Sequence, residues 1–346
     1  MNISKEIVMS PKGDITLYSI TNASGAQVVL SSLGAGINKI IVPDKDGNKA
    51  DVILGYENPC DYDNDGPCSG KTPGRYANRI KHGKITIDRK EYNLPINNGP
   101  NHLHGGPEGF QNKIWNSEVV GNSVVFTRVS PDGEMGYPGE VLAKVTYTWD
   151  DENRLSIDFE ATTNAATYIN LTNHAYFNLG GHDNGNIMEH LLQLNCSNYL
   201  PTDPSEAPLG YIEAVAGTPM DFTSPKAIGK ELFADFEAIK IGKGYDHCFV
   251  VDNWVKGQLK EIGTLTDPVS GRSLTIHSTQ PGTQVYTGNW LTGSPKGKGG
   301  KEYKDYDLVA IECQGFPDAP NQPSFPSQLL LPGETYNQTI IYHFKA

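Results

Sequence analysis

Four polar clusters carry most of the side chains in this sequence that could do chemistry. They occupy residues 73–80, 101–106 and 170–181, and the fourth combines residues 244–247 with 310–315. Their ionisable side chains include His102, His104, His174, Arg75, Arg79, Asp246 and Glu312. Imidazole and carboxylate groups exchange protons near neutral pH, so these residue types favour general acid–base catalysis.

The third cluster has the alternation of a strand with one polar face. In an extended chain one face would carry Asn170, Thr172, His174, Tyr176 and Asn178. The odd-numbered positions from 169 to 179 are mostly apolar and are typical of a core face. A row of hydrogen-bonding groups with aromatic surface suits a sugar, which offers hydroxyls at its rim and C–H groups on its faces.

Glu312 is the strongest candidate for a general base. In a strand over residues 307–314 it shares one side with Leu308, Ala310 and Gln314, while Val309, Ile311 and Cys313 lie opposite. A carboxylate in such an apolar strand is costly to bury unless it has partners or a catalytic task.

Ordinary structural roles compete with these interpretations. His102 and His104 alternate, so we expect at most one of them to serve a site. Arg75 and Arg79 could form surface ion pairs, and no local pattern says which is functional. Asp246 follows a glycine and a tyrosine and could be a turn residue. Apart from the His-x-His pair no metal-ligand spacing is present, so we expect no bound metal.

Charge and composition limit the classes of partner. The 346 residues include 28 basic and 40 acidic side chains, a net charge of −12, which disfavours nucleic acid and suits a neutral small molecule. The five cysteines form no CxxC pair, which indicates reduced thiols in a cytoplasmic protein. No apolar run approaches the roughly 18 residues of a membrane span, and the start lacks a signal-peptide core.

Short strands separated by turn residues dominate the rest of the chain. The runs 117–120 and 124–129 flank Gly121-Asn122, a hairpin turn. Only residues 226–236 show helical spacing, through Ile228, Leu232 and Phe236. We predict an all-β protein, a large sandwich with few short helices. The glycine- and lysine-rich residues 294–304 are predicted to form a mobile surface connection.

Six segments in order resemble the aldose 1-epimerase (galactose mutarotase) family. They are residues 74–80, 101–106, 170–180, 244–247, 280–289 and 312–321. The resemblance implies one sandwich domain over residues 1–346, with the site in a groove on one sheet. It also implies no cofactor. We expect no nucleic-acid or membrane partner, from charge and hydropathy, and a monomer or weak homodimer. The stretch 66–73 is more polar than we expect for this family.

The resemblance also assigns roles to individual residues. It implies Glu312 as catalytic base, His174 as general acid and His104 as second active-site histidine. Arg79 and Asp246 would bind hydroxyls, and Asn78 and Gln284 would make lesser contacts with the sugar.

The implied reaction interconverts the α and β anomers of aldohexoses such as galactose and glucose. Ionised Glu312 would take the proton of the anomeric hydroxyl, and protonated His174 would deliver one to the ring oxygen, without extreme pKa shifts. Two alternatives stay open at this point. One is a glycoside hydrolase or lyase that uses Asp246 and Glu312 as its carboxylate pair. The other is a sugar-binding protein without catalysis.

Overall fold

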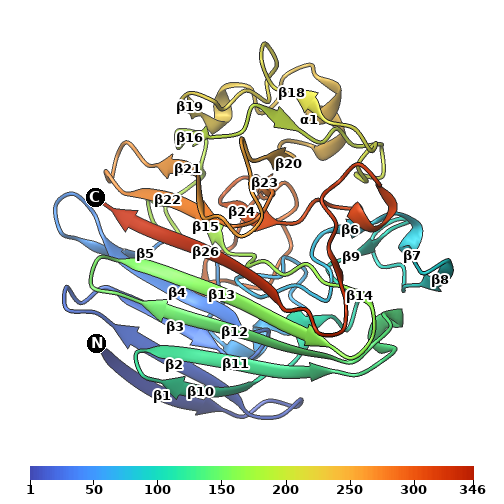
Figure 1. The fold of residues 1–346 in the computed structure, drawn as a ribbon. Coiled ribbons are helices and arrows are strands. Elements are labelled where there is room, and N and C mark those ends of the chain that lie inside the picture. Colours follow the sequence, from blue (N-terminus) through green and yellow to red (C-terminus); the bar gives the residue numbers. More distant parts are fainter.

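The computed structural model, which describes residues 1–346, is built from three antiparallel sheets (Figure 1). The five-stranded sheet contains β1 (Asn2–Val8), β2 (Ile15–Thr21), β3 (Gln27–Ser31), β4 (Gly36–Pro43) and β5 (Lys49–Asp51). The nine-stranded sheet has the order β10 (Asn116–Val120), β11 (Ser123–Ser130), β12 (Val141–Trp149), β13 (Arg154–Thr163), β26 (Tyr336–Lys345), β22 (Ser273–Ser278), β21 (Lys260–Thr266), β16 (Leu191–Leu194) and β19 (Lys226–Ala227).

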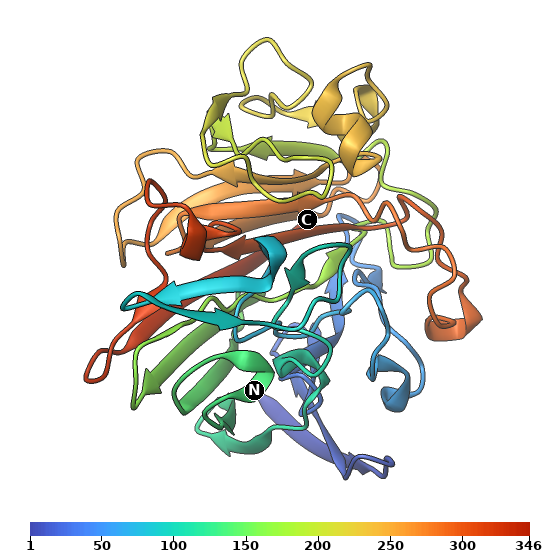
Figure 2. The same cartoon turned by 90° about the vertical axis from the view of Figure 1, so that its right-hand side faces the viewer.

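The six-stranded sheet has the order β15 (Tyr176–Phe177), β24 (Val309–Gln314), β23 (Gly282–Tyr286), β20 (Asp246–Val250), β17 (Asn198–Tyr199) and β18 (Glu213–Ala214). Three short pairs join β14 (Thr167–Tyr168) to β25 (Leu329–Leu330), β6 (Arg79–Ile80) to β9 (His102–Leu103), and β7 (Lys84–Ile87) to β8 (Lys90–Asn93). The β7–β8 hairpin lies beside the short helix at Ala319–Asn321 on the side that faces the viewer in Figure 2.

Helices are few and short. The one α-helix is α1 (Glu237–Gly242). The 3-10 helices are η1 (Pro59–Tyr62), η2 (Lys81–Gly83), η3 (Phe110–Asn112), η4 (Glu134–Gly136), η5 (Ile228–Lys230), η6 (Lys298–Gly300) and η7 (Ala319–Asn321). None of these helices has the length and apolar character needed to cross a lipid bilayer.

Alternating burial along the long strands explains why the sheets stack. On β12 every second residue from Val141 to Trp149 is buried and the residues between are more exposed. The buried face meets the five-stranded sheet, where the Tyr147 hydroxyl donates to the carbonyl of Ala35 at 2.7 Å. The core cluster of 57 buried residues draws on all three sheets. The predicted all-β sandwich is therefore confirmed, and the single domain over residues 1–346 stays a prediction.

The predicted helix over residues 226–236 is wrong, because this segment bonds to a neighbouring strand instead of to itself. Residues 226–227 form β19 against β16. The N–H groups of Ile228 and Gly229 then donate to the carbonyls of His190 and Met188, both at 2.9 Å. Ile228 and Leu232 are buried as their spacing suggested, but a short 3-10 turn achieves this burial.

The loop over residues 294–304 is anchored, which contradicts the prediction of a mobile connection. Lys298 is only 4% exposed. Its Nζ donates to the carbonyls of Asn38 and Ile53 at 3.0 and 2.9 Å and lies 2.6 Å from Asp51 Oδ2. Composition showed the glycines and lysines of this loop, but it could not show that one lysine turns inward.

Candidate active site

The six-stranded sheet presents one polar face, and antiparallel register determines which residues lie on it. Glu312 on β24 is directly opposite Gln284 on β23, which is opposite Cys248 on β20. Residues opposite one another, and residues two apart, share a face, so Asp246 lies on the same side. Val309, Ile311 and Cys313 point to the main core, which confirms the alternation predicted for residues 307–314.

A cleft of about 900 Å³ opens over this face. Its wall also includes residues from the chain between β5 and β9, from the loop before β18, and from the loop after β23. The side chains that matter for chemistry are Asp65, Asn78, Arg79, His104, His174, Tyr176, Glu206, Asp246, Tyr286, Trp290 and Glu312.

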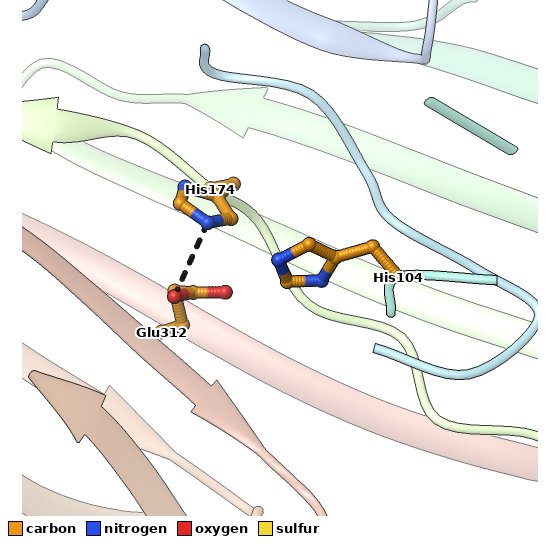
Figure 3. A group of neighbouring side chains, drawn as sticks. All are labelled: His104, His174 and Glu312. Atoms are coloured by element: carbon orange, nitrogen blue, oxygen red, sulfur yellow. Dashed lines mark ion pairs between the residues drawn. The ribbon is translucent and has the colours of Figure 1, made fainter. Parts of the chain in front are cut away.

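His104, His174 and Glu312 meet at the cleft wall, and Figure 3 shows their side chains turned toward one another. His174 Nε2 lies 3.4 Å from Glu312 Oε1, and the two histidine rings pack edge-on with centroids 5.1 Å apart. Glu312 is 2% and His174 4% exposed. Glu312 Oε2 and His174 Nδ1 have no hydrogen-bond partner. Buried polar atoms are normally paired, so unpaired atoms in this site are available to form hydrogen bonds with a ligand.

Burial shifts both members of this pair away from charge. Desolvation, with a smaller contribution from Asp246, raises the pKa of Glu312 well above its ordinary value. Desolvation also lowers the pKa of His174 to about 4. Our expectation of a carboxylate and an imidazolium without strong shifts is therefore wrong, because both groups lie away from water.

His104 is held in one tautomer by the backbone. Its Nδ1 accepts a hydrogen bond from the Asn78 N–H at 3.1 Å, so in the neutral ring Nε2 carries the proton. Burial, His174 and Arg79 lower the pKa of His104 well below its ordinary value. His104 can therefore donate a hydrogen bond to a ligand while it stays neutral.

The close approach of two chain segments places His104 in the cleft. Gly105 follows it with φ +77°, and a Cβ atom there would lie 1.8 Å from the carbonyl oxygen of Gly74. Only glycine fits such a contact at positive φ. The pairing of β6 with β9 then sets Arg79 beside Leu103, one residue before His104.

Arg79 sits among acidic and amide groups. Its Nη2 forms an ion pair with Glu206 and lies 3.5 Å from Asp246 Oδ2, while its Nε donates to Asn98 Oδ1 at 3.1 Å. Asp246 also accepts a hydrogen bond from Gln284 Nε2 at 2.6 Å. Sequence reasoning missed Glu206 and Asn98, since each lies in a loop with no periodic pattern.

The structure resolves two choices that the sequence left open. Arg75 is buried away from the cleft, where its guanidinium donates to the carbonyls of Pro138 and Gly139 at 2.9 and 2.8 Å. His102 also points away, with Nε2 2.8 Å from the Tyr137 hydroxyl. Arg79 and His104 are the members of each pair that line the cleft.

The polar row predicted for residues 170–178 is wrong in part, because only Tyr176–Phe177 are strand. His174 and Tyr176 line the cleft, whereas the other members of the row are fully buried. Asn170 Nδ2 donates to the carbonyl of Ala77 at 3.1 Å, and Asn178 Nδ2 donates to that of Asp307 at 2.9 Å. These asparagines satisfy backbone groups of irregular chain, a role that alternation does not reveal.

The two predicted lesser contacts lie differently. Asn78 lines the cleft beside Arg79. Gln284 is 3% exposed and is absent from the lining, so it supports Asp246 from behind.

The polar stretch 66–73 serves a turn at the cleft edge. Asp65 accepts hydrogen bonds from the N–H groups of Cys68 and Ser69 at 3.1 and 2.9 Å. Lys71 Nζ lies 2.8 Å from Asp65 Oδ1, and both side chains are buried.

Three side chains of the site could also act as metal ligands. The donor atoms of His104, His174 and Glu312 all lie within 4.8 Å of one another. Two imidazoles and a carboxylate form a ligand set that zinc accepts. The same three groups are also suited to proton transfer, so geometry alone allows both uses.

Comparison with known proteins identifies the family. The family model described as "Aldose 1-epimerase" matches residues 16–343. The galactose mutarotase of Rattus norvegicus is 43% identical over 317 residues, which cover 92% of this chain and 90% of the rat protein. The aldose 1-epimerase of Escherichia coli strain K12 is 36% identical, with 98% of both chains covered.

Solved structures agree over the whole length. The aldose epimerase homologue from C. elegans superimposes with a TM-score of 0.87 at 33% identity and covers 99% of both chains. The galactose 1-epimerase from Lactobacillus acidophilus gives a TM-score of 0.86 at 29% identity, with 99% of this chain and 98% of that chain covered. The chain therefore belongs to the aldose 1-epimerase family of isomerases.

Proposed function

We propose that this protein is an aldose 1-epimerase that interconverts the α and β anomers of free aldohexoses such as galactose and glucose. One observation carries this proposal: Glu312 and His174, 138 positions apart in the chain, meet at 3.4 Å on the wall of an open cleft. The reaction involves two oxygens bonded to the same carbon, so an acid and a base that serve it must be neighbours. The names of the relatives from Rattus norvegicus and Escherichia coli point to the same reaction.

Ring opening begins at the anomeric hydroxyl. Glu312 takes the proton of O1, the C1–O5 bond breaks, and the electron pair of that bond goes to O5. O5 receives a proton from His174, and C1 becomes an aldehyde carbon. After these two proton transfers Glu312 is a neutral carboxyl group and His174 is a neutral imidazole.

Ring closure reverses these transfers after rotation about the C1–C2 bond. His174 takes back the proton of O5, which attacks the opposite face of C1. Glu312 returns its proton to O1, and the other anomer leaves. No atom is gained or lost, and the scheme needs no cofactor or metal.

The remaining site residues hold and polarise the sugar. The Nε2–H of His104 points a neutral donor at the developing alkoxide, the position at which fixed dipoles are most effective. Arg79 and Asp246 bind sugar hydroxyls, and Gln284 holds Asp246 in place. Tyr176 and Tyr286 offer ring surface to the C–H faces of the sugar.

We extend the proposal to the setting of the enzyme. All five cysteines are free, which suits the reducing cytoplasm. All the catalytic groups come from one chain, so a monomer or a weak homodimer suffices for activity.

The decisive experiment is polarimetry on freshly dissolved α-galactose and α-glucose. We expect the protein to speed the approach to the equilibrium rotation. An unchanged rate with measurable sugar binding would instead support a non-catalytic binder. New reducing ends from a disaccharide or an aryl glycoside would support a glycosidase that uses the carboxylates of Asp246 and Glu312.

A further inference from the structure

The proposed mechanism leaves one carboxylate of the cleft without a task. Glu206 lines the cleft and forms an ion pair with Arg79. It lies in the loop before β18, far in sequence from every cluster that suggested chemistry. Its side chain is 22% exposed, so it reaches the open part of the cleft.

The wall around Glu206 carries more negative than positive charge. Arg79 is the one lysine or arginine among the lining residues, and it faces three carboxylates: Glu206, Asp246 and Glu312. The fourth lining carboxylate, Asp65, is balanced by Lys71 at 2.8 Å. Even when Glu312 is protonated and neutral, the two negative charges of Glu206 and Asp246 exceed the one positive charge of Arg79.

Lys243, which packs on the cleft residue Trp290, does not change this balance of charge. Lys243 Nζ lies 4.0 Å from the centre of the Trp290 ring, but it is paired with Asp305 at 3.0 Å. The cleft is therefore an anionic concavity, and such shapes concentrate the field of their charges.

The backbone holds Glu206 in place at some conformational cost. Its φ of +63° lies in the left-handed region, which costs a non-glycine residue of order 1 kcal/mol. Asp203 fixes the turn, because its Oδ1 accepts hydrogen bonds from Ser205 N–H at 2.8 Å and Ala207 N–H at 3.3 Å. Lys81 in turn binds Asp203 at 2.6 Å. A strained residue in a braced turn beside a ligand cleft indicates a functional position.

We propose that Glu206 makes this cleft selective for charge: it admits neutral aldoses and protonated amino sugars and disfavours sugars that carry a carboxylate or phosphate. The inference rests on the proposed function only in assuming that an aldose occupies the cleft. Glu206 and Asp246 attract an ammonium group and repel an anion, and Arg79 offsets only one of them. One unit charge at a few ångströms in a wet cleft changes affinity by about threefold or more.

The test is equilibrium binding, measured by calorimetry, so it does not depend on turnover. Galactose, galactosamine and galacturonate are titrated at a pH at which the amine is protonated and the acid ionised. We expect galactosamine to bind the unmodified protein at least about tenfold more tightly than galacturonate. Glu206→Gln should reduce that ratio by about threefold or more, and added salt should shrink it in the unmodified protein.

The matched control is Glu231→Gln, which also removes a carboxylate from an ion pair, in this case with Lys226, but lies outside the cleft. It should leave the ratio of the two affinities unchanged.

If Glu206 only holds Arg79 in place, Glu206→Gln will weaken the binding of all three sugars by the same factor, and the proposal is wrong. Equal binding of the charged sugars to the unmodified protein would also overturn it. If the sugars bind with the expected ratio but α-galactose does not mutarotate faster, only the proposed function fails; if none binds, both fail.

Discussion

Replacing Glu312 by glutamine tests the proposed base with a nearly isosteric side chain. Glutamine keeps the length of the side chain and a carbonyl oxygen, but it cannot accept the proton of O1. The carboxylate is 2% exposed and its Oε2 has no partner, while its Oε1 lies 3.4 Å from His174 Nε2, a contact that the carbonyl oxygen of glutamine can keep. Burial raises the pKa of Glu312, which means that the fold disfavours its charge. The neutral amide should therefore leave the melting temperature unchanged or raise it.

The expected loss of activity is large. A positioned general base typically contributes ~10²–10⁴-fold, which corresponds to a barrier increase of about 3–5 kcal/mol. Because Glu312 and His174 pass protons within one cycle, their effects should not add. The double variant with His174→Asn should be little slower than either single variant.

Polarimetry on fresh α-galactose at saturating and limiting concentrations gives kcat and KM for each variant. Gln314→Met is the matched control, since Gln314 is buried on the same face of β24 but does not line the cleft. We expect this control to keep most of the activity. A Glu312→Gln protein that folds and turns over within about tenfold of the unmodified rate would refute the assignment.

Four further outcomes follow from the site and the core. Activity should fall as the pH decreases toward about 4, where His174 takes up a proton. Glu312 and His174 then hold two protons between them, and the mechanism requires one. A rate that stays constant through pH 4 would contradict this. Gln284→Met should raise KM for galactose by roughly tenfold, because Asp246 loses a hydrogen bond of 2.6 Å, and a change confined to kcat would argue against a supporting role. Burial lowers the pKa of His102 to about 4 from its ordinary 6.5, so the unfolded chain binds the extra proton and stability falls as pH drops from 6.5 toward 4. His102→Gln should flatten that loss by up to about 3 kcal/mol in denaturant titrations, whereas an unchanged slope would assign the loss to other groups. Dialysis against a strong chelator should leave mutarotation unchanged, and loss of activity with recovery on adding zinc would show that the three-ligand cluster binds a required metal.

Strands with one buried face could be predicted from the sequence, and the elements that were missed or predicted wrongly have physical explanations. The alternation of β12 comes directly from packing one face against the core. β24 is buried on both faces, and its alternation separates the core residues Val309, Ile311 and Cys313 from the polar face that carries Glu312. β1 was not predicted, because it is an edge strand whose residues are nearly all exposed, so burial leaves no pattern in it. Ile228 and Leu232 have helical spacing, but hydrogen bonds to residues 188–190 keep the segment from forming a helix.

A site residue could be predicted from sequence where its polarity differed from that of its neighbours in the same strand. Glu312 was conspicuous as a carboxylate within an apolar strand. Arg75 and Arg79 carry the same charge four residues apart, and only the fold shows that one binds carbonyls and the other faces the cleft. Glu206 gave no signal in the sequence, because the proposed role depends on its ion pair with Arg79, 127 positions earlier.

The opposed pKa shifts of Glu312 and His174 fit a reaction that is symmetrical in its protons. In the proposed cycle the ring opens with Glu312 as a carboxylate and His174 as an imidazolium, and it closes with Glu312 as a carboxyl and His174 as a neutral imidazole. Burial disfavours both charges, so it lowers the free energy of the state that exists while the sugar is open. The hydroxyls of a bound sugar can donate to the carboxylate and favour its charged form, which brings the two states closer in energy. Neither proton has to leave the site, and a pair that holds one proton between its members can serve both anomers equally.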